Sequence, residues 1–379
     1  MCTRHGFAQT IRKLVFILDT IKTYPCPCCG ASLAYDGASK SLHCDSCGND
    51  YTPETLQQIF DADTRTSGDS AYDWSKYEPR SFGETESEGL RTYTCPACAA
   101  EITGTAAMGA TVCPYCGNAA IVEKQFVGSY QPDYIVPFRI DKKAAMESFE
   151  NTCKKLPFLP DEFKNKKKIE EMSGVYVPFW MFDCKANAAI TYRGERTSAW
   201  SDSENDYVKT DHYKIFRAGT LDFANLPVDA SKKADDAYMD ALEPYNLDDA
   251  VNFDTAYLAG YLADKYDVSA ADSEPRANER IKKTTETTFA GTVEGFSGVV
   301  PENSKVNFSD GKVRYSMLPV WMLHITYEGK NYAYAINGQT GKVVGSFPVS
   351  KKKRNLYFLK AFGIGVAVMA AILALIALL

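Results

Sequence analysis

The sequence predicts an α+β protein with two small four-cysteine zinc ribbons, a mixed α+β middle domain with antiparallel strands, and one C-terminal transmembrane helix. Three observations lead to this fold class. Eight of the twelve cysteines form four C-x-x-C pairs, aromatic and β-branched residues alternate between turn signals over 125–350, and residues 361–379 carry no charge. The 379 residues, 45% hydrophobic and 24% charged, have the composition of a folded protein with more than one domain.

An N-terminal extension, residues 1–23, precedes the first ribbon. Its apolar run, 14–18, follows Arg12 and Lys13 but is too short for a secretory signal, and no small-residue cleavage site comes after it. We interpret the run as a short helix, or as sequence upstream of a true start nearer Thr20.

Four C-x-x-C pairs in an internal repeat predict zinc ribbons at 24–51 and 93–122. In each ribbon 14 residues separate the two pairs, and corresponding cysteines lie 69 residues apart. Two such turns complete a tetrahedral thiolate site, and so small a unit needs its metal ion to fold. The predicted ligands of the two structural Zn²⁺ ions are Cys26, Cys29, Cys44 and Cys47 in one ribbon, and Cys95, Cys98, Cys113 and Cys116 in the other.

Sulfur fills all four positions of each predicted site, so no position remains for a catalytic water. Cys28 is a surplus thiol in the first ribbon, and it either fills a variable position or replaces a neighbouring ligand. We interpret His43, next to Cys44, as a surface residue. Paired C-x-x-C motifs also favour a reducing compartment.

The ribbons are acidic, which favours protein partners over nucleic acid. Residues 24–51 carry one Lys against three Asp, and residues 93–120 carry Glu101 and no Lys or Arg. Each zinc held by four thiolates adds a net charge of about −2, and the whole chain has a formal charge of −6. Nucleic-acid binding stays open as the alternative, although it normally uses basic residues.

The segment 52–92 is predicted to be an acidic flexible linker between the ribbons. Residues 49–94 hold ten Asp or Glu against four Lys or Arg, with Ser, Thr and Gly interleaved. A short helix is predicted near Pro53–Phe60. Trp74 and Tyr77 are either a docking element or a contact with a neighbouring ribbon.

The middle domain, 125–350, begins with strand and helix patterns and closes with hairpins. A pentapeptide at Val177–Met181 recurs at Leu318–Met322, an offset of 141, which suggests two related halves. The proline in each copy predicts a strand start or a sheet edge. Strands are predicted at Tyr134–Phe138, Val175–Tyr192, Tyr207–Leu221, Leu318–Tyr327, Asn331–Ile336 and Lys342–Phe347. Helices are predicted at Lys142–Lys155, Ala234–Leu242, Asp254–Lys265 and Ser269–Thr288.

No catalytic signature is present, so we predict that the protein is not an enzyme. The sequence has no G-x-x-x-x-G-K-[ST] loop, no H-E-x-x-H and no G-x-S-x-G, and its four histidines are far apart. His324 is interpreted as an ordinary sheet residue, and Cys153 and Cys184 as core or surface thiols. The lysines of 164–168 are interpreted as a solvated helix face, with a lipid-facing patch as the alternative.

The C-terminus predicts a single membrane anchor. A basic juxtamembrane segment, 351–360, precedes an apolar run at 361–379 that is about 28 Å long as a helix, enough to cross a bilayer. Because positive charge beside a span stays on the cytoplasmic side, residues 1–350 are expected in the cytoplasm, attached to the cell membrane by one pass.

The order of these motifs resembles a family of bacterial membrane-anchored double zinc-ribbon proteins. The motifs are paired Cys-Pro-x-Cys ribbons, an Ile-Val-Pro-Phe strand, a Tyr-Val-Pro-Phe-Trp strand, a Leu-Pro-Val-Trp strand and a basic-flanked tail. Members are labelled as containing a transcription factor II B type zinc ribbon or, by transfer, as a primosomal replication-restart helicase. The hairpin at 334–344 is also similar to the closing hairpin of PepSY-like domains.

The family resemblance implies membrane-associated scaffolding, in some members beside envelope-stress proteins of the phage-shock or flotillin-like type. The helicase label lacks support here, because no phosphate-binding loop is present. We therefore expect a non-enzymatic, tail-anchored protein whose ribbons recruit protein partners at the cytoplasmic membrane face. The alternative is a membrane-tethered nucleic-acid-binding protein without helicase activity.

Overall fold

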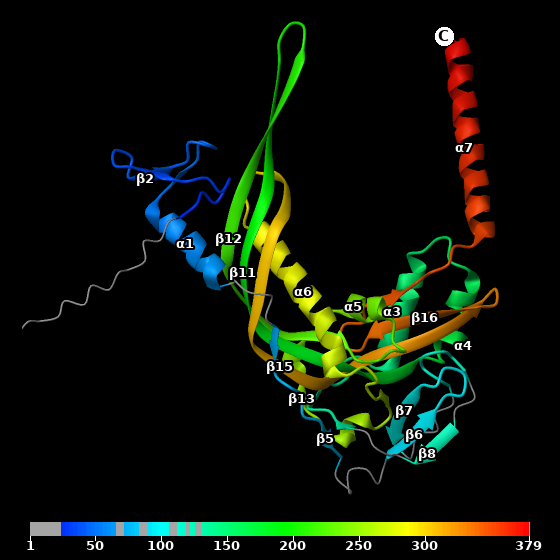
Figure 1. The fold of residues 1–379 in the computed structure, drawn as a ribbon. Helices are drawn as coiled ribbons and strands as arrows, with labels where there is room; N and C mark the ends of the chain where they lie inside the picture. The colour runs from blue at the N-terminus through cyan, green and yellow to red at the C-terminus, as the bar shows by residue number, and fades with distance from the viewer. Residues whose placement is uncertain are drawn as a thin grey trace, which may run out of the picture.

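The computed structural model describes residues 24–65, 72–82, 90–105, 112–118, 122–125 and 130–378. It confirms the α+β class, with antiparallel sheets, two clusters of four cysteines and an apolar C-terminal helix. A long β-hairpin and the C-terminal helix rise from the same side of the body, and the first ribbon lies beside the hairpin (Figure 1). The predicted N-terminal helix falls outside the described residues.

Two very long strands form the centre of the molecule. Strands β11 (Ser173–Ser201) and β15 (Ser297–Tyr327) pair antiparallel from one end of the body into the hairpin. Val177 pairs with Leu318, so the two copies of the repeated pentapeptide meet at their first residues and extend in opposite directions from that pair. Strand β12 (Asp206–Asp229) folds back on β11 and completes the hairpin.

The repeated prolines lie inside these strands, so the predicted strand starts and sheet edges are wrong. Pro178 lies between the part of β11 that pairs with β14 (Leu262–Asp264) and the part that pairs with β12. Pro319 likewise separates the part of β15 that pairs with β10 (Tyr134–Ile135) from the part that pairs with β16 (Lys330–Asn337). Proline has no N–H to donate, and each lies where the neighbouring strand changes.

Most predicted middle-domain elements are present with shifted ends. Helices α3 (Lys142–Lys154) and α6 (Ala270–Ala290) begin after Asp141 and Ser269, whose side chains accept hydrogen bonds from backbone N–H groups of the first turn. Ile281 of α6 packs into the core of the hairpin base. The remaining elements are α4 (Lys166–Ile169), α5 (Asp236–Leu242), β13 (Val251–Asn252) and β17 (Val343–Gly345), with 3-10 turns at Asp161–Lys164, Leu247–Asp249 and Thr255–Leu258.

Two middle-domain predictions need correction. The predicted helix Asp254–Lys265 is wrong, because Gly260 adopts a positive φ of 84° that ends the 3-10 turn, and the chain continues as β14. The predicted strand Tyr134–Phe138 is shorter, since only Tyr134 and Ile135 pair with β15.

The acidic segment between the ribbons is attached to the body, which corrects the flexible-linker prediction for its described part. Helix α1 (Pro53–Arg65) extends beyond the predicted Phe60, β4 (Tyr72–Trp74) pairs with β15, and β5 (Arg80–Ser81) pairs with β9 (Tyr130–Gln131). Trp74 packs edge-on against Phe182 and donates from Nε1 to Asn278 Oδ1 at 2.9 Å. Tyr77 packs against Trp180. Both aromatic residues therefore contact the middle domain rather than a ribbon.

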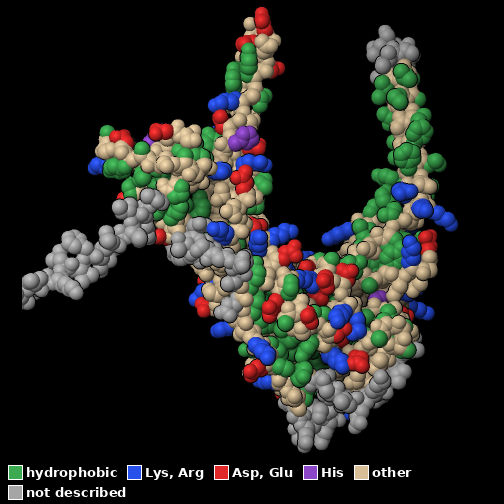
Figure 2. Space-filling view, viewed as in Figure 1, with side chains coloured by type: hydrophobic (Ala, Val, Ile, Leu, Met, Phe, Trp, Pro, Cys, Tyr) green, Lys and Arg blue, Asp and Glu red, His purple; other side chains and the backbone are tan. Residues whose placement is uncertain are grey.

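The C-terminal helix α7 (Lys351–Leu378) includes the basic segment that the sequence placed before the span. It is long and apolar enough to cross a membrane, and its apolar window is fully exposed. Figure 2 shows its apolar side chains uncovered along the helix, with Lys and Arg at its base.

Replacing Trp74 by alanine should detach the acidic segment from the middle domain. Removing a packed tryptophan of this kind costs about 3 kcal/mol. We expect limited proteolysis within residues 75–82 to become several-fold faster in Trp74→Ala than in the parent protein. Lys76→Ala, a change at an exposed residue of the same segment, is the control, and equal cleavage of all three proteins would show that the segment is not held by Trp74.

Candidate metal centres

The first ribbon brings its four predicted ligands together. Strands β1 (Ala34–Asp36), β2 (Ser41–His43) and β3 (Asp50–Tyr51) form a small antiparallel sheet that places the two C-x-x-C turns face to face. The sulfur atoms lie within 4.8 Å of one another. The Cys26–Cys47 sulfur distance is 3.6 Å, and the Cys29–Cys44 distance is 3.5 Å.

The second ribbon repeats this geometry on β6 (Leu90–Thr94), β7 (Glu101–Thr105) and β8 (Val122–Gln125). Its Cys95–Cys116 and Cys98–Cys113 sulfur pairs are 3.6 and 3.7 Å apart. A tetrahedral ion with metal–sulfur bonds of about 2.3 Å places its sulfur ligands about 3.8 Å apart. Both clusters therefore fit a metal ion bound by four thiolates and are compatible with zinc.

The turns share one backbone pattern. In each, the first cysteine accepts a hydrogen bond from the residue that follows the second cysteine, for example Gly30 N to Cys26 O at 2.8 Å. The donor residue has a positive φ in every case, at Gly30, Gly48, Ala99 and Gly117. Ala99, with φ 57°, is the one of these four residues that is not glycine, and its Cβ disfavours this conformation.

Backbone N–H groups stabilise thiolates in both clusters. The Asn49 N–H lowers the pKa of the Cys47 thiol to about 6. Burial is the largest single influence on Cys95 and raises its pKa, but the hydrogen bonds that the thiolate accepts, first those from the backbone N–H groups of Cys98 and Ala97, lower the pKa to about 7. Since metal ions bind thiolates, these N–H groups favour binding near neutral pH.

Cys28 and His43, which lie near the first cluster in the sequence, are not among its ligands. The four-sulfur group consists of the predicted cysteines without Cys28. His43 Nδ1 donates to Asp50 Oδ1, 2.9 Å away, on the surface of the ribbon. The predicted surface role of His43 is therefore confirmed.

The first ribbon is largely exposed. Cys26 and Cys44 are buried, whereas Cys29 and Cys47 are exposed. Tyr24 contacts Phe60 of α1, which packs on β11 and β12, and Lys214 Nζ of β12 donates to Cys28 O at 2.8 Å. Figure 1 shows this ribbon standing out beside the hairpin.

The second ribbon is built into the body. Its strand β7 pairs with β14 of the middle domain, with Thr103 opposite Ala263, so its sheet continues the central sheet. Cys95 and Cys113 are buried in the same apolar cluster as Val177 and Leu318. The two ribbons thus share ligands and turn geometry but differ in their surroundings.

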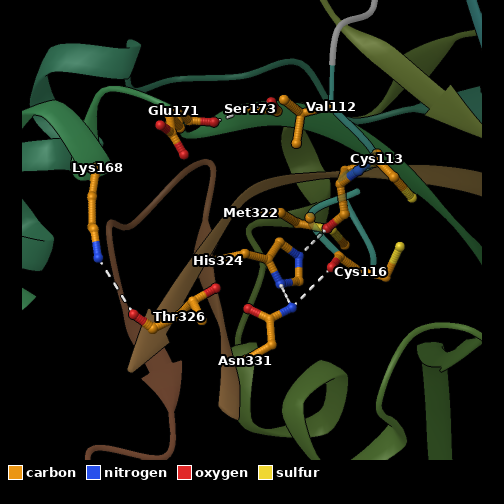
Figure 3. Close-up of a pocket in the computed structure, with 12 residues that line it drawn as sticks. Val112, Cys113, Cys116, Lys168, Glu171, Ser173, Met322, His324, Thr326 and Asn331 are labelled. Carbon is orange, nitrogen blue, oxygen red and sulfur yellow. Dashed lines mark hydrogen bonds between the residues drawn. The ribbon is translucent and has the colours of Figure 1, made fainter. Parts of the chain in front are cut away.

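Polar bonds hold the second metal-binding turn on the body. His324 Nε2 lies 2.6 Å from Pro114 O, and Asn331 Nδ2 donates to Cys116 O at 2.9 Å (Figure 3). Because a carbonyl only accepts, Nε2 carries the proton, and burial lowers the pKa of His324 so that it stays neutral. On another side of the turn, Tyr115 Oη donates to the buried Asp264 Oδ2 at 2.6 Å.

The sequence did not identify these supporting residues. His324 lies on a strand as expected, but it contacts a metal-binding turn 210 residues away. The available signal was a polar side chain in a run that is otherwise apolar, Leu318–Ile325. Cys153 and Cys184 are both buried, which agrees with the core interpretation.

Residues of this turn, of α4 and of β15 together line a cavity of about 270 Å³. Cys113 and Cys116 line it on the ribbon side, and Lys168 and Glu171 on the other (Figure 3). Lys168 Nζ donates to Thr326 O at 3.3 Å. Its lysine and histidine are thus bonded to neighbouring backbone, and the cavity belongs to the contact between ribbon and body.

Comparison with known proteins gives one extensive similarity. The chain is 36% identical over 340 residues to the uncharacterized protein YdjG of Bacillus subtilis (strain 168), which covers 89% of this chain and 93% of YdjG. No family model matches the chain, and no solved structure matches it. The resemblance to proteins labelled as transcription factor II B type zinc-ribbon proteins therefore stays a prediction.

The Ala99→Gly substitution should stabilise the second ribbon. It removes the cost of a left-handed alanine, about 1 kcal/mol, and we expect slower loss of metal to a chelator. The matched reverse change is Gly117→Ala, which introduces strain at φ 72° and brings a Cβ to 3.2 Å from His324 Cβ. It should speed metal loss, and equal rates in both variants would contradict the assigned turn geometry.

Removing the two metal sites should have unequal effects. Cys95→Ser with Cys98→Ser should lower metal content from two ions per chain to one and raise amide exchange in β14, because β7 pairs with it. Cys26→Ser with Cys29→Ser should also remove one ion but leave exchange in β14 unchanged. Two ions retained in either variant would show that the ligand assignment is wrong.

Proposed function

We propose that this chain, which belongs to the family of the Bacillus subtilis protein YdjG, is a non-enzymatic membrane-anchored protein whose first ribbon recruits protein partners at the cytoplasmic face of the membrane. Two structural zinc ions complete the ribbons in this proposal. The observation that carries it is the contrast between the ribbons. The second serves the body as a packed element, whereas the first presents most of its surface to solvent.

The surface of the first ribbon supports a protein partner of basic character. Asp36, Asp45 and Asp50 are exposed, against one lysine, Lys40. Tyr35 is 61% exposed on β1, where exposed aromatic residues commonly anchor protein contacts. The charge of a zinc-bound thiolate cluster adds to this acidity. Phosphate backbones would be repelled by the same charges, so nucleic-acid binding is the weaker alternative.

Helix α7 supports the membrane anchor. Its apolar side chains have no protein cover in the described chain, and four basic residues, 351–354, begin the helix. Burying these side chains in lipid removes their contact with water. The basic end would stay in the cytoplasm beside anionic lipids.

Affinity purification tests both parts of the proposal. The tagged full-length protein is solubilised from membranes with detergent, with and without nuclease, and co-purifying proteins are identified by mass spectrometry. We expect proteins that still co-purify after nuclease treatment and whose recovered amount falls at least five-fold with the Tyr35→Ser variant. The control is Tyr257→Ser, which changes an exposed tyrosine of the middle domain.

Three results would contradict the proposal. Partners lost on nuclease treatment would favour the nucleic-acid alternative. Partners unaffected by Tyr35→Ser and by the double variant Cys26→Ser with Cys29→Ser would show that the first ribbon does not recruit them. Protein released from membranes by alkaline carbonate would show that α7 does not cross the bilayer.

A further inference from the structure

The hairpin and the C-terminal helix project from the body in nearly the same direction (Figure 1). Helix α7 has 28 residues and is about 42 Å long at 1.5 Å per residue. The tip of the hairpin reaches the level of the far end of α7, and open space separates the two (Figure 2). A bilayer that enclosed α7 in this arrangement would also enclose the outer part of the hairpin.

The outer hairpin is unsuited to hydrocarbon. Beyond Glu195, the last β11 residue that pairs with β15, the described hairpin consists only of the two strands β11 and β12. Its outward backbone groups have no strand partner there, and lipid offers none. The outer hairpin also carries the exposed charges of Arg196, Asp202, Glu204, Asp206 and Lys209. Charged side chains inside a membrane are strongly disfavoured.

Among the described residues, the contacts of helix α7 with the body lie near its first residues. Ser350 N donates to Phe158 O at 2.7 Å, and Lys353 Nζ donates to Leu159 O at 2.8 Å and pairs with Asp161. Tyr357 contacts the ring of Phe158. Ser346 O accepts a hydrogen bond from Tyr334 Oη at 2.9 Å and Phe347 packs on the Tyr334 ring, so the part of the connection from β17 that has neither regular structure nor such packing is 348–350. The side chains of 358–370 and 372–374 are exposed. A change in helix direction therefore breaks only a few surface contacts.

The hairpin tip carries an aromatic pair suited to a membrane surface. Trp200 and Tyr207 are cross-strand partners with rings stacked 5.6 Å apart, and they are 51% and 40% exposed. Tryptophan and tyrosine combine an apolar ring with a polar atom and concentrate at membrane–water interfaces. The acidic turn at 202–206 next to them favours a shallow position, in headgroups rather than hydrocarbon.

We propose that α7 turns away from the hairpin about residues 348–350 when it enters a bilayer, until the hairpin tip rests on the headgroup layer of the same leaflet. This inference rests on the proposed membrane anchor. Trp200 and Tyr207 make a second contact with the membrane, away from the basic start of α7. The body is then fixed at two points, and its orientation to the membrane is set.

Tryptophan quenching by brominated lipids tests the inference in the full-length protein. Of the four tryptophans, Trp180 and Trp321 are buried, Trp74 is half-buried and Trp200 is exposed. Subtracting the signal of Trp200→Phe isolates the tip. In phosphatidylcholine vesicles we expect bromines near the headgroup to quench this signal at least three-fold more than bromines deep in the acyl chains. Trp321→Phe is the control and should leave the difference unchanged.

Two results would overturn the inference. An isolated Trp200 signal that neither lipid quenches would show that the tip does not touch the membrane. Stronger quenching by the deep bromines would show that the hairpin enters the hydrocarbon and that α7 does not turn. A photoreactive benzoylphenylalanine at position 362 distinguishes these two results from failure of the membrane anchor, because it labels lipid only if α7 is embedded in the bilayer.

Discussion

The antiparallel pairing of β11 with β15 is the constraint on which the rest of the structure depends. Much of the described body is attached to one of these strands by strand pairing. The hairpin strand β12 and the strand β14 pair with β11, and β4, β10 and β16 pair with β15. The second ribbon reaches the pair through β14. The prolines of the repeated pentapeptide mark where one attached strand gives way to another.

The two ribbons show how one ligand set serves different purposes. In both ribbons, four cysteines and two tight turns form the local geometry that a tetrahedral metal ion requires. The contacts around the turns differ. Tyr115, Pro114 and Cys116 bond to the body in the second ribbon, whereas the first is held through Tyr24 and the Cys28 carbonyl. The two ribbons therefore share the geometry that could hold a metal ion and differ in how much of their surface is exposed.

Local patterns predicted most elements because their causes are local. The C-x-x-C spacing identified the eight clustered cysteines, the pattern of 269–288 predicted the helix that is α6, and the uncharged tail identified α7. Where the prediction was wrong, distant contacts decide the structure. The acidic composition of 52–92 predicted a flexible linker, but Trp74 is held by Phe182 and Asn278, more than a hundred residues away. No local pattern relates His324 to Pro114.

The unequal exposure of the two clusters has a kinetic consequence. An incoming thiol or chelator must reach the metal ion before a bound thiolate leaves, and the exposed Cys29 and Cys47 give it a direct approach. In the second cluster the turns are covered by the body, so exchange waits for the ribbon to open. With metal bound, one chain would thus contain a site that equilibrates readily with the metal supply of its surroundings and another that keeps the ion acquired during folding.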